Sequence, residues 1–394
     1  MRKLPVPLSE YEDRIEKCRR LANDAGLQAL MVFSHSPDRP GNVRYLSNYY
    51  AACSFNASSL PGQPLRRGMA DSCVLIPVDN EPSLIKAEVP YDSEIAIKDT
   101  RDYPEDIVDM VSKVVREKHL DSARIGVAGE DIIAAFLMRL MREALPKVKF
   151  EYADHMIEGL RQIKSANEIE LMRKTAELSD KALRAAVDAV KPGVRERDVG
   201  AVAAATMLRE GAERVLFNDV QSGPNSESVI AWPMAGDRVI QEDDIVMIDL
   251  GGQDDNGYFF DVARTTIAGK ASKPRRDLVR LGREATDYVA KIGRSGLRGI
   301  EWMQKTNDFV KERMKTGQYN MSQPDPVMFI GHGMGLDMES LWYVPGADME
   351  LKDGMVISIE PWIRVQGLGA SRFEELMLVT KKGGELLNKY RYDI

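Results

Sequence analysis

The amino-terminal 158 residues alternate between apolar patterns of helical period and short apolar runs bounded by turn residues. This alternation predicts a small α/β domain over residues 1–158. The expected helices and strands follow one another closely along the chain. The helices cover residues 8–25, 103–118 and 130–145, and the strands cover 29–33, 73–78, 83–88, 124–129 and 148–154.

A long helical pattern over residues 163–193 opens the second part of the chain. Ser165 and Glu168 have the spacing of a capping box at its start, and Pro192-Gly193 stops it. Another helix is expected over 198–210, followed by strand-like runs. The runs cover residues 244–252, 258–269, 355–365 and 373–380. Helices followed by strands predict an α+β domain over residues 159–394.

Composition narrows the class of protein. The 394 residues carry a net charge of −7, with 44% hydrophobic and 29% charged residues, which is typical of an acidic globular protein without affinity for nucleic acid or an anionic membrane. The charged amino-terminal segment lacks the apolar stretch of a secretory signal, so we expect a cytoplasmic protein. Three cysteines without CxxC spacing predict neither disulfides nor a zinc–thiolate site.

Four carboxylates and one histidine lie where burial makes them costly. Asp249 ends the apolar run IVMI, and Asp261 lies on the expected returning strand of a hairpin, where the two carboxylates would repel each other. Either a shared cation or protonation would relieve the repulsion. His332 lies in the glycine frame GHGMG, and acids interrupt or begin two further apolar strands. These two acids are Glu360 and Glu374.

Each of these five residues alone also fits a structural reading: a hydrogen-bonded turn aspartate, a histidine in a tight turn, or glutamates at a sheet edge. Together they form an oxygen-rich set with one imidazole, the kind of ligand set that two divalent metal ions use. Four carboxylates roughly balance two dications. Manganese, cobalt, iron and zinc are all compatible with such a site.

The order of motifs "IDLGG…GYFFDVART", "GHGMG", "GMVISIEPW" and "RFEEL" resembles the pita-bread metallopeptidases, a family that includes prolidase, aminopeptidase P and the non-peptidase creatinase. The amino-terminal half resembles the two-domain creatinase, prolidase and aminopeptidase P branch. The resemblance implies a pita-bread catalytic domain, a homodimer and two divalent metal ions. It assigns as metal ligands Asp249, Asp261, His332, Glu360 and Glu374, with Asp261 and Glu374 bridging the ions.

The resemblance also implies further site residues. The family's histidine after "GHGMGLD" is replaced near Glu339, and a second histidine is replaced near Trp232. An ionised Glu339 could accept a hydrogen bond from a cationic substrate nitrogen, and Trp232 offers an indole donor or a ring face. Arg372 is expected to orient Glu374, and Tyr258 to assist catalysis from the hairpin.

Three functions follow. In the first, a hydroxide shared by two metal ions attacks an amide-type C–N bond while Glu360 or Glu374 accepts the proton; the resemblance makes an Xaa-Pro peptidase acting on short peptides the leading reading. The second is a creatinase-like hydrolase or lyase of a small nitrogen compound. The third is an inactive binding scaffold. Retention of all five ligand types favours an enzyme over the scaffold.

Overall fold

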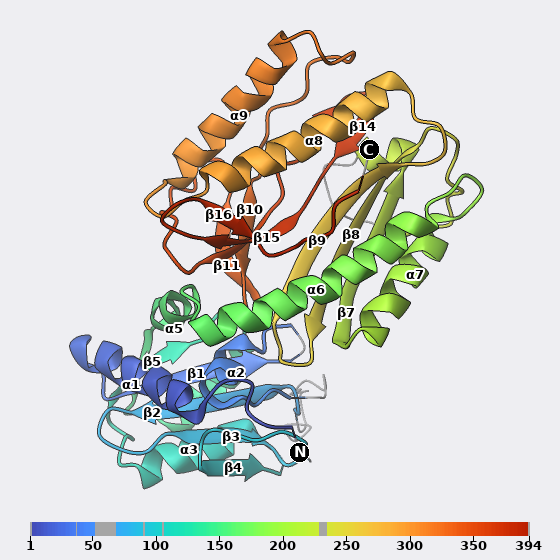
Figure 1. Cartoon of the computed structure of the whole chain (residues 1–394). Coiled ribbons are helices and arrows are strands. Elements are labelled where there is room, and N and C mark those ends of the chain that lie inside the picture. The colour runs from blue at the N-terminus through green and yellow to red at the C-terminus, as the bar shows by residue number, and fades with distance from the viewer. Residues whose placement is uncertain are drawn as a thin grey trace. The chain divides into compact units, whose positions relative to one another are not determined.

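The computed structural model describes residues 2–36, 38–51, 68–89, 91–104, 106–227 and 235–392 (Figure 1). Its Cα positions divide into two compact units, Met1–Arg161 and Gln162–Ile394. The boundary predicted after residue 158 falls inside helix α5 (Asp154–Arg161), which completes the first unit.

The first unit is built on a six-stranded sheet of order β4-β3-β2-β1-β5-β6. Strand β2 runs antiparallel to both β1 and β3, while β4, β5 and β6 each pair in parallel with their inner neighbour. The strands are β1 (Ala29–His35), β2 (Asp71–Pro77), β3 (Ser83–Ala87), β4 (Asp99–Tyr103), β5 (Arg124–Ala128) and β6 (Lys149–Tyr152).

Helices pack on this sheet with their apolar faces. Helix α3 begins after Asp106, whose side chain accepts a hydrogen bond from the Val108 amide, and its valines at helical spacing join the buried core. Besides α5, the helices of this unit are α1 (Leu8–Asp24), α2 (Gly41–Ser47), α3 (Ile107–Glu117) and α4 (Ala135–Ala144). The α/β expectation for this part of the chain is therefore confirmed.

The second unit contains a three-stranded antiparallel sheet, β7-β8-β9, with α6 and α7 against it (Figure 1). The strands are β7 (Ala212–Ser222), β8 (Ile245–Asp254) and β9 (Phe259–Ile267), and the helices are α6 (Ala166–Ala189) and α7 (Glu196–Arg209). The capping box at the start of α6 is confirmed, because Ser165 and Glu168 each bind the other's backbone amide. A short 3-10 turn, η1 (Gly223–Glu227), follows β7.

A second sheet of order β11-β10-β12-β15-β16 and a small hairpin, β13-β14, complete this unit. Helices α8 (Lys273–Ile292) and α9 (Gly299–Lys315) pack on each other beside it, and Trp302 of α9 is fully buried in the core. The strands are β10 (Gly331–Met334), β11 (Met338–Tyr343), β12 (Val356–Ile359), β13 (Ile363–Val365), β14 (Gly369–Ser371), β15 (Glu375–Val379) and β16 (Gly384–Leu386).

Hydrogen bonds from the second sheet tie it to β9. The Glu374 amide donates to the Ala263 carbonyl at 3.0 Å, and Ser358 Oγ donates to the Asp261 carbonyl at 2.6 Å. The chain thus brings the end of β12 and the start of β15 against the middle of β9. This junction places strand ends from both sheets around one point.

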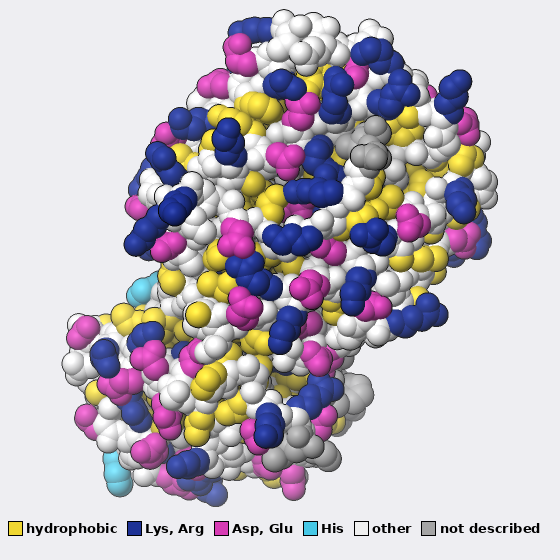
Figure 2. Space-filling view, viewed as in Figure 1, with side chains coloured by type: hydrophobic (Ala, Val, Ile, Leu, Met, Phe, Trp, Pro, Cys, Tyr) yellow, Lys and Arg dark blue, Asp and Glu magenta, His cyan; other side chains and the backbone are white. Residues whose placement is uncertain are grey.

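The surface carries charges of both signs. Lys and Arg side chains alternate with Asp and Glu over the face seen in Figure 2. Within the described residues, none of the helices combines the length and the apolar character that a membrane-spanning segment requires. Cys18 and Cys73 are buried free thiols, and burial raises the pKa of the Cys18 thiol to about 12; Cys53 lies outside the described residues.

Candidate metal centre

The hairpin formed by β8 and β9 carries the first two acids. Its register runs without a shift from Ile245 opposite Ile267 to Gln253 opposite Phe259. Asp249 lies opposite Ala263, and Asp261 lies opposite Gly251, so the two carboxylates are two positions apart on the same face of the sheet. The predicted hairpin is confirmed, and this strand pair has no bulge.

His332 lies on β10, next to Gly331, which has a φ of +152°. A Cβ atom on Gly331 would stand 2.0 Å from the Ser358 carbonyl oxygen of β12, so only glycine permits this close approach. Strand β12 therefore approaches the backbone of β10 closely at this glycine. It seats the imidazole, 2% exposed, at the junction of the two sheets.

Glu360 and Glu374 reach the same point from the second sheet. Glu360 follows β12, and Glu374 precedes β15, where Ser358 Oγ donates to its Oε1 at 3.0 Å. From His332 Nε2 the nearest carboxylate oxygens lie 3.4 Å away on Asp261, 3.5 Å on Glu360 and 3.9 Å on Glu374. Three of the four predicted acidic ligands therefore surround one imidazole nitrogen.

The donor set fits divalent metal ions. One ligand atom each from Asp261, His332 and Glu374 lies within 4.8 Å of the others. Among the predicted ligands, three buried carboxylate oxygens have no hydrogen-bond partner: Oδ1 of Asp249, Oδ1 of Asp261 and Oε2 of Glu374. Buried carboxylate oxygens require a partner or a cation, and oxygen ligands with one imidazole suit the metals named above.

Arg372 differs from its predicted role. Its guanidinium contacts Asp249 through one nitrogen and donates to Glu360 Oε2 at 2.9 Å through another. It does not pair directly with Glu374 among the contacts seen, so it orients the other two acids instead. Asp249 is thereby held beside the cluster through Arg372, and the five predicted ligands share one site.

We expect Arg372→Met to lower metal affinity by about 10- to 100-fold, because Asp249 and Glu360 lose the group that orients them. Arg372→Lys should give an intermediate loss, since an ammonium keeps the charge but cannot hold two carboxylates in a planar fork. Competition titration with a fluorescent chelator measures this affinity. Arg364→Met, on strand β13, is the control, and equal affinities for both methionine variants would contradict the role of Arg372.

The metal-free site also holds protons. Burial, reinforced by Asp261, raises the pKa of Glu374 to about 7, and burial together with Glu374 raises the pKa of Glu360 well above its ordinary value. Burial opposes the charge on His332, but the hydrogen bond and charge of Asp261 together with the charge of Glu374 outweigh it and raise the imidazole pKa. At least one proton must therefore leave when a cation enters.

We expect the affinity for Mn²⁺ to rise with pH up to about 7 and to level off above it, because the raised pKa values keep carboxylates protonated in more acidic solution. Calorimetric titrations at about pH 6 in two buffers of different ionisation enthalpy should show about one proton released per chain, and fewer at about pH 8.5. An affinity that does not change with pH would contradict this.

Glu339 lies outside the cavity, so the structure does not support the substrate contact predicted for it. Its carboxylate pairs with Lys164 Nζ at 2.6 Å, and both side chains are almost fully buried. On β11 the cavity is lined by Met338 and Trp342, whereas Glu339 points to the opposite face, as alternation along a strand requires. The acid therefore balances a buried lysine.

Tyr258 is likewise placed away from the cavity. Its hydroxyl donates to Glu168 at 3.1 Å at the start of α6, and the side chain is buried there. This position gives it a structural contact in place of the predicted catalytic one. Trp232 lies outside the described residues.

A cavity of about 380 Å³ opens onto the site. Its polar lining comes from Asp219, Asp249, Asp261, His332, Glu360 and Arg372. Its apolar lining comes from Phe217, Phe329, Met338, Trp342, Val344 and Trp362. Asp219 was not predicted from the sequence, because polar residues around it interrupt the apolar pattern of strand β7. The signal available in the sequence was the position of Asp219 two residues after Phe217, since residues two apart lie on the same face of a strand.

Known families match both parts of the chain. Residues 170–381 match "Metallopeptidase family M24", and residues 14–163 match "Creatinase/Prolidase N-terminal domain". An Xaa-Pro dipeptidase of Pyrococcus furiosus is 32% identical over 242 residues, which cover 61% of this chain and 67% of that protein. An Xaa-Pro dipeptidase of Lactobacillus helveticus is 28% identical over 71% of this chain and 74% of its own.

Solved structures show the same architecture. The prolidase from Pyrococcus furiosus superposes with a TM-score of 0.76 at 25% identity and covers 95% of this chain and 100% of its own. An Xaa-Pro dipeptidase from Bacillus anthracis superposes with a TM-score of 0.78 at 24% identity, covering 98% of this chain and 99% of that one. The predicted fold, an amino-terminal α/β domain followed by a pita-bread domain, is confirmed.

Proposed function

The chain belongs to metallopeptidase family M24, and from this premise we propose that it is a metal-dependent Xaa-Pro peptidase that cleaves the bond before proline in short peptides. The proposal rests on one observation: Asp261, His332 and Glu374 converge, with Glu360 beside them. Asp261, His332 and Glu360 line a cavity. Relatives named Xaa-Pro dipeptidase support the choice of substrate.

Asp249, Asp261, His332, Glu360 and Glu374 would hold two divalent ions, which when bound lower the pKa of a shared water and polarise the scissile carbonyl. Glu360 or Glu374 would accept the proton from the attacking water, because an oxygen of each carboxylate lies within 3.9 Å of His332 Nε2 in the cluster. Arg372 holds the opposite oxygen of Glu360 and keeps that carboxylate in place.

The apolar lining serves the substrate. Trp342 stacks on His332 with ring centroids 4.8 Å apart, and Phe329 stacks on Trp342 at 5.6 Å. These rings extend the cavity wall outward from the metal ligands and exclude water from one side of the imidazole. A proline ring is an apolar group of the size that such a wall accommodates.

The finer assignments are also proposals. We propose that the enzyme is cytoplasmic, and the family resemblance supports a homodimer. The creatinase-like alternative rests on the two replaced histidines, and the pairing of Glu339 with Lys164 argues against a substrate contact at one of those two positions. The scaffold alternative has no observation in its favour, because a binding role does not require this cluster of buried acids.

The test is hydrolysis of Ala-Pro and Ala-Ala by chain that has been stripped with a chelator and reloaded separately with Mn²⁺, Co²⁺, Fe²⁺ or Zn²⁺. We expect no turnover without metal and selective cleavage of Ala-Pro after reloading. Amidines, ureas and cyclic amides are assayed in parallel. Turnover of one of these, with no dipeptide cleaved, would favour the creatinase-like function, and failure to retain any metal would reject both enzymes.

A further inference from the structure

Asp219 is a buried carboxylate that the proposed chemistry does not use. Its side chain lines the cavity, the residue is 2% exposed, and neither of its carboxylate oxygens has a hydrogen-bond partner. Leaving an ionised carboxylate buried without a partner is costly. The position therefore indicates a group that arrives from outside the chain.

The sheet register fixes where Asp219 stands. It lies opposite Asp249, which lies opposite Ala263, so Asp219 belongs to the same face as the two hairpin acids but on the outermost strand, β7. Strands in a sheet are about 4.8 Å apart, which places its backbone roughly 10 Å from that of β9. Asp219 is thus at the far side of the cavity from Asp261.

The charges nearest to Asp219 are already engaged. Burial raises the pKa of Asp219 to about 6, and the charge of Arg372 only partly opposes that rise, because the guanidinium is held by Asp249 and Glu360. Asp219 does not belong to the metal-binding group of Asp261, His332 and Glu374 found among the described residues. A cationic group brought by a ligand would satisfy a carboxylate in this position.

The aromatic ring of Phe217 lines the cavity together with Asp219. Phe217 lies two positions before Asp219 on β7 and on the same face, opposite Gly251. Its ring covers that glycine so closely that a Cβ atom would stand 2.2 Å from it, so Gly251 keeps the ring in the cavity wall. Apolar stems of lysine and arginine pack on such rings while their charged ends reach a carboxylate.

We propose that Asp219 is a specificity-determining residue that binds the cationic side chain of the residue before proline, so that the enzyme prefers Arg-Pro and Lys-Pro. This inference rests on the proposed peptidase function. The α-amine of the substrate is one carbon atom from the scissile carbonyl and stays near the metal ligands, whereas an arginyl or lysyl side chain spans several methylene groups and can reach β7. In Xaa-Pro dipeptides the second residue is always proline, so the first side chain is the part that differs from one substrate to another.

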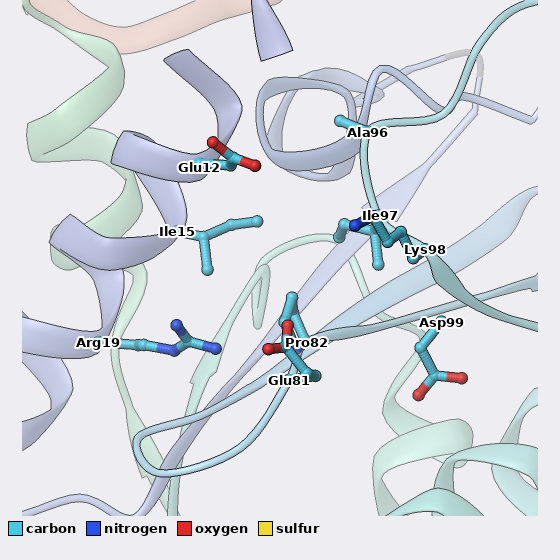
Figure 3. A pocket seen from close by; sticks show the side chains of 9 residues that line it. All are labelled: Glu12, Ile15, Arg19, Glu81, Pro82, Ala96, Ile97, Lys98 and Asp99. Atoms are coloured by element: carbon cyan, nitrogen blue, oxygen red, sulfur yellow. The ribbon is translucent and has the colours of Figure 1, made fainter. Parts of the chain in front are cut away.

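A hollow in the amino-terminal unit lacks these features (Figure 3). Arg19 on α1 donates to the carbonyl oxygens of Pro77 and Asn80, and Asp99 pairs with Arg101 and Lys118. Arg19 and Asp99 therefore have partners within the chain. An unpartnered buried charge distinguishes the cavity at Asp219.

The experiment compares Arg-Pro with citrullyl-Pro, which has nearly the same shape but no charge, in the metal-loaded wild type and in Asp219→Asn. We expect the wild type to favour Arg-Pro by about 10- to 100-fold in kcat/KM. The variant should bring this ratio close to one, mainly by raising KM for Arg-Pro, and leave citrullyl-Pro nearly unchanged. Asp255→Asn, an exposed acid of the β8-β9 turn, is the control.

A wild-type ratio near one would overturn the proposal, and so would an equal loss for both dipeptides in a variant that retains its metal and its melting temperature. If no dipeptide is cleaved at all, the peptidase function fails separately. Calorimetry with butylguanidinium and butylurea then decides the question at Asp219. Tighter binding of butylguanidinium by wild type but not by Asp219→Asn supports it, and equal binding rejects it.

Discussion

Asp261→Asn is expected to lower the rate of Xaa-Pro cleavage by roughly 10³-fold or more, because a bound metal supplies several kcal/mol of transition-state stabilisation and each 1.4 kcal/mol is a factor of ten. The asparagine keeps the shape of the side chain but removes its charge. It also directs an amide toward His332 Nε2 or toward the buried acids around it. Asp261 Oδ2 lies 3.4 Å from that nitrogen, so the change strikes the centre of the cluster.

Steady-state kinetics and elemental analysis of the same samples measure this prediction. The variant should lose bound metal together with activity, and its fold should be retained because asparagine fits the same space. Asp255→Asn removes an exposed acid from the turn of the same hairpin and should leave both properties unchanged. Full activity with a full complement of metal in Asp261→Asn would exclude the proposed centre.

Glu339→Met is expected to lower the free energy of unfolding by about 3–5 kcal/mol, since it leaves a buried lysine without its partner. Lys164 Nζ lies 2.6 Å from Glu339, and the two side chains are 1% and 6% exposed. Replacing both residues by methionine removes both charges from the interior. The double variant should recover most of the stability, because an apolar pair does not require mutual charge compensation.

Urea unfolding of the two single variants and the double variant measures the coupling. We also expect the double variant to keep its kcat/KM, since Glu339 faces away from the cavity that Met338 and Trp342 line. A stable double variant with greatly reduced kcat/KM would return Glu339 to the substrate contact predicted from the sequence. Equal stability of Glu339→Met and wild type would show that the ion pair contributes little.

Local sequence patterns were sufficient for much of the fold. The capping box of Ser165 and Glu168, the hairpin through Asp249 and Asp261, and the glycine frame of His332 all depend on residues close together in the chain. Their signals are turn chemistry, capping and apolar period, which act over a few residues. Strand β7 was not predicted, because Asn218, Asp219 and Gln221 interrupt its apolar pattern.

The sequence by itself determined which residue types are available for a metal centre and which strands carry them. Only the tertiary structure decided which partner each side chain has. Arg372 contacts Asp249 and Glu360, and Lys164 pairs with Glu339, 175 positions further along the chain. Asp219 lines the cavity from strand β7. The physical reason is that alternation along a strand separates its two faces, but packing between distant segments determines what each face meets.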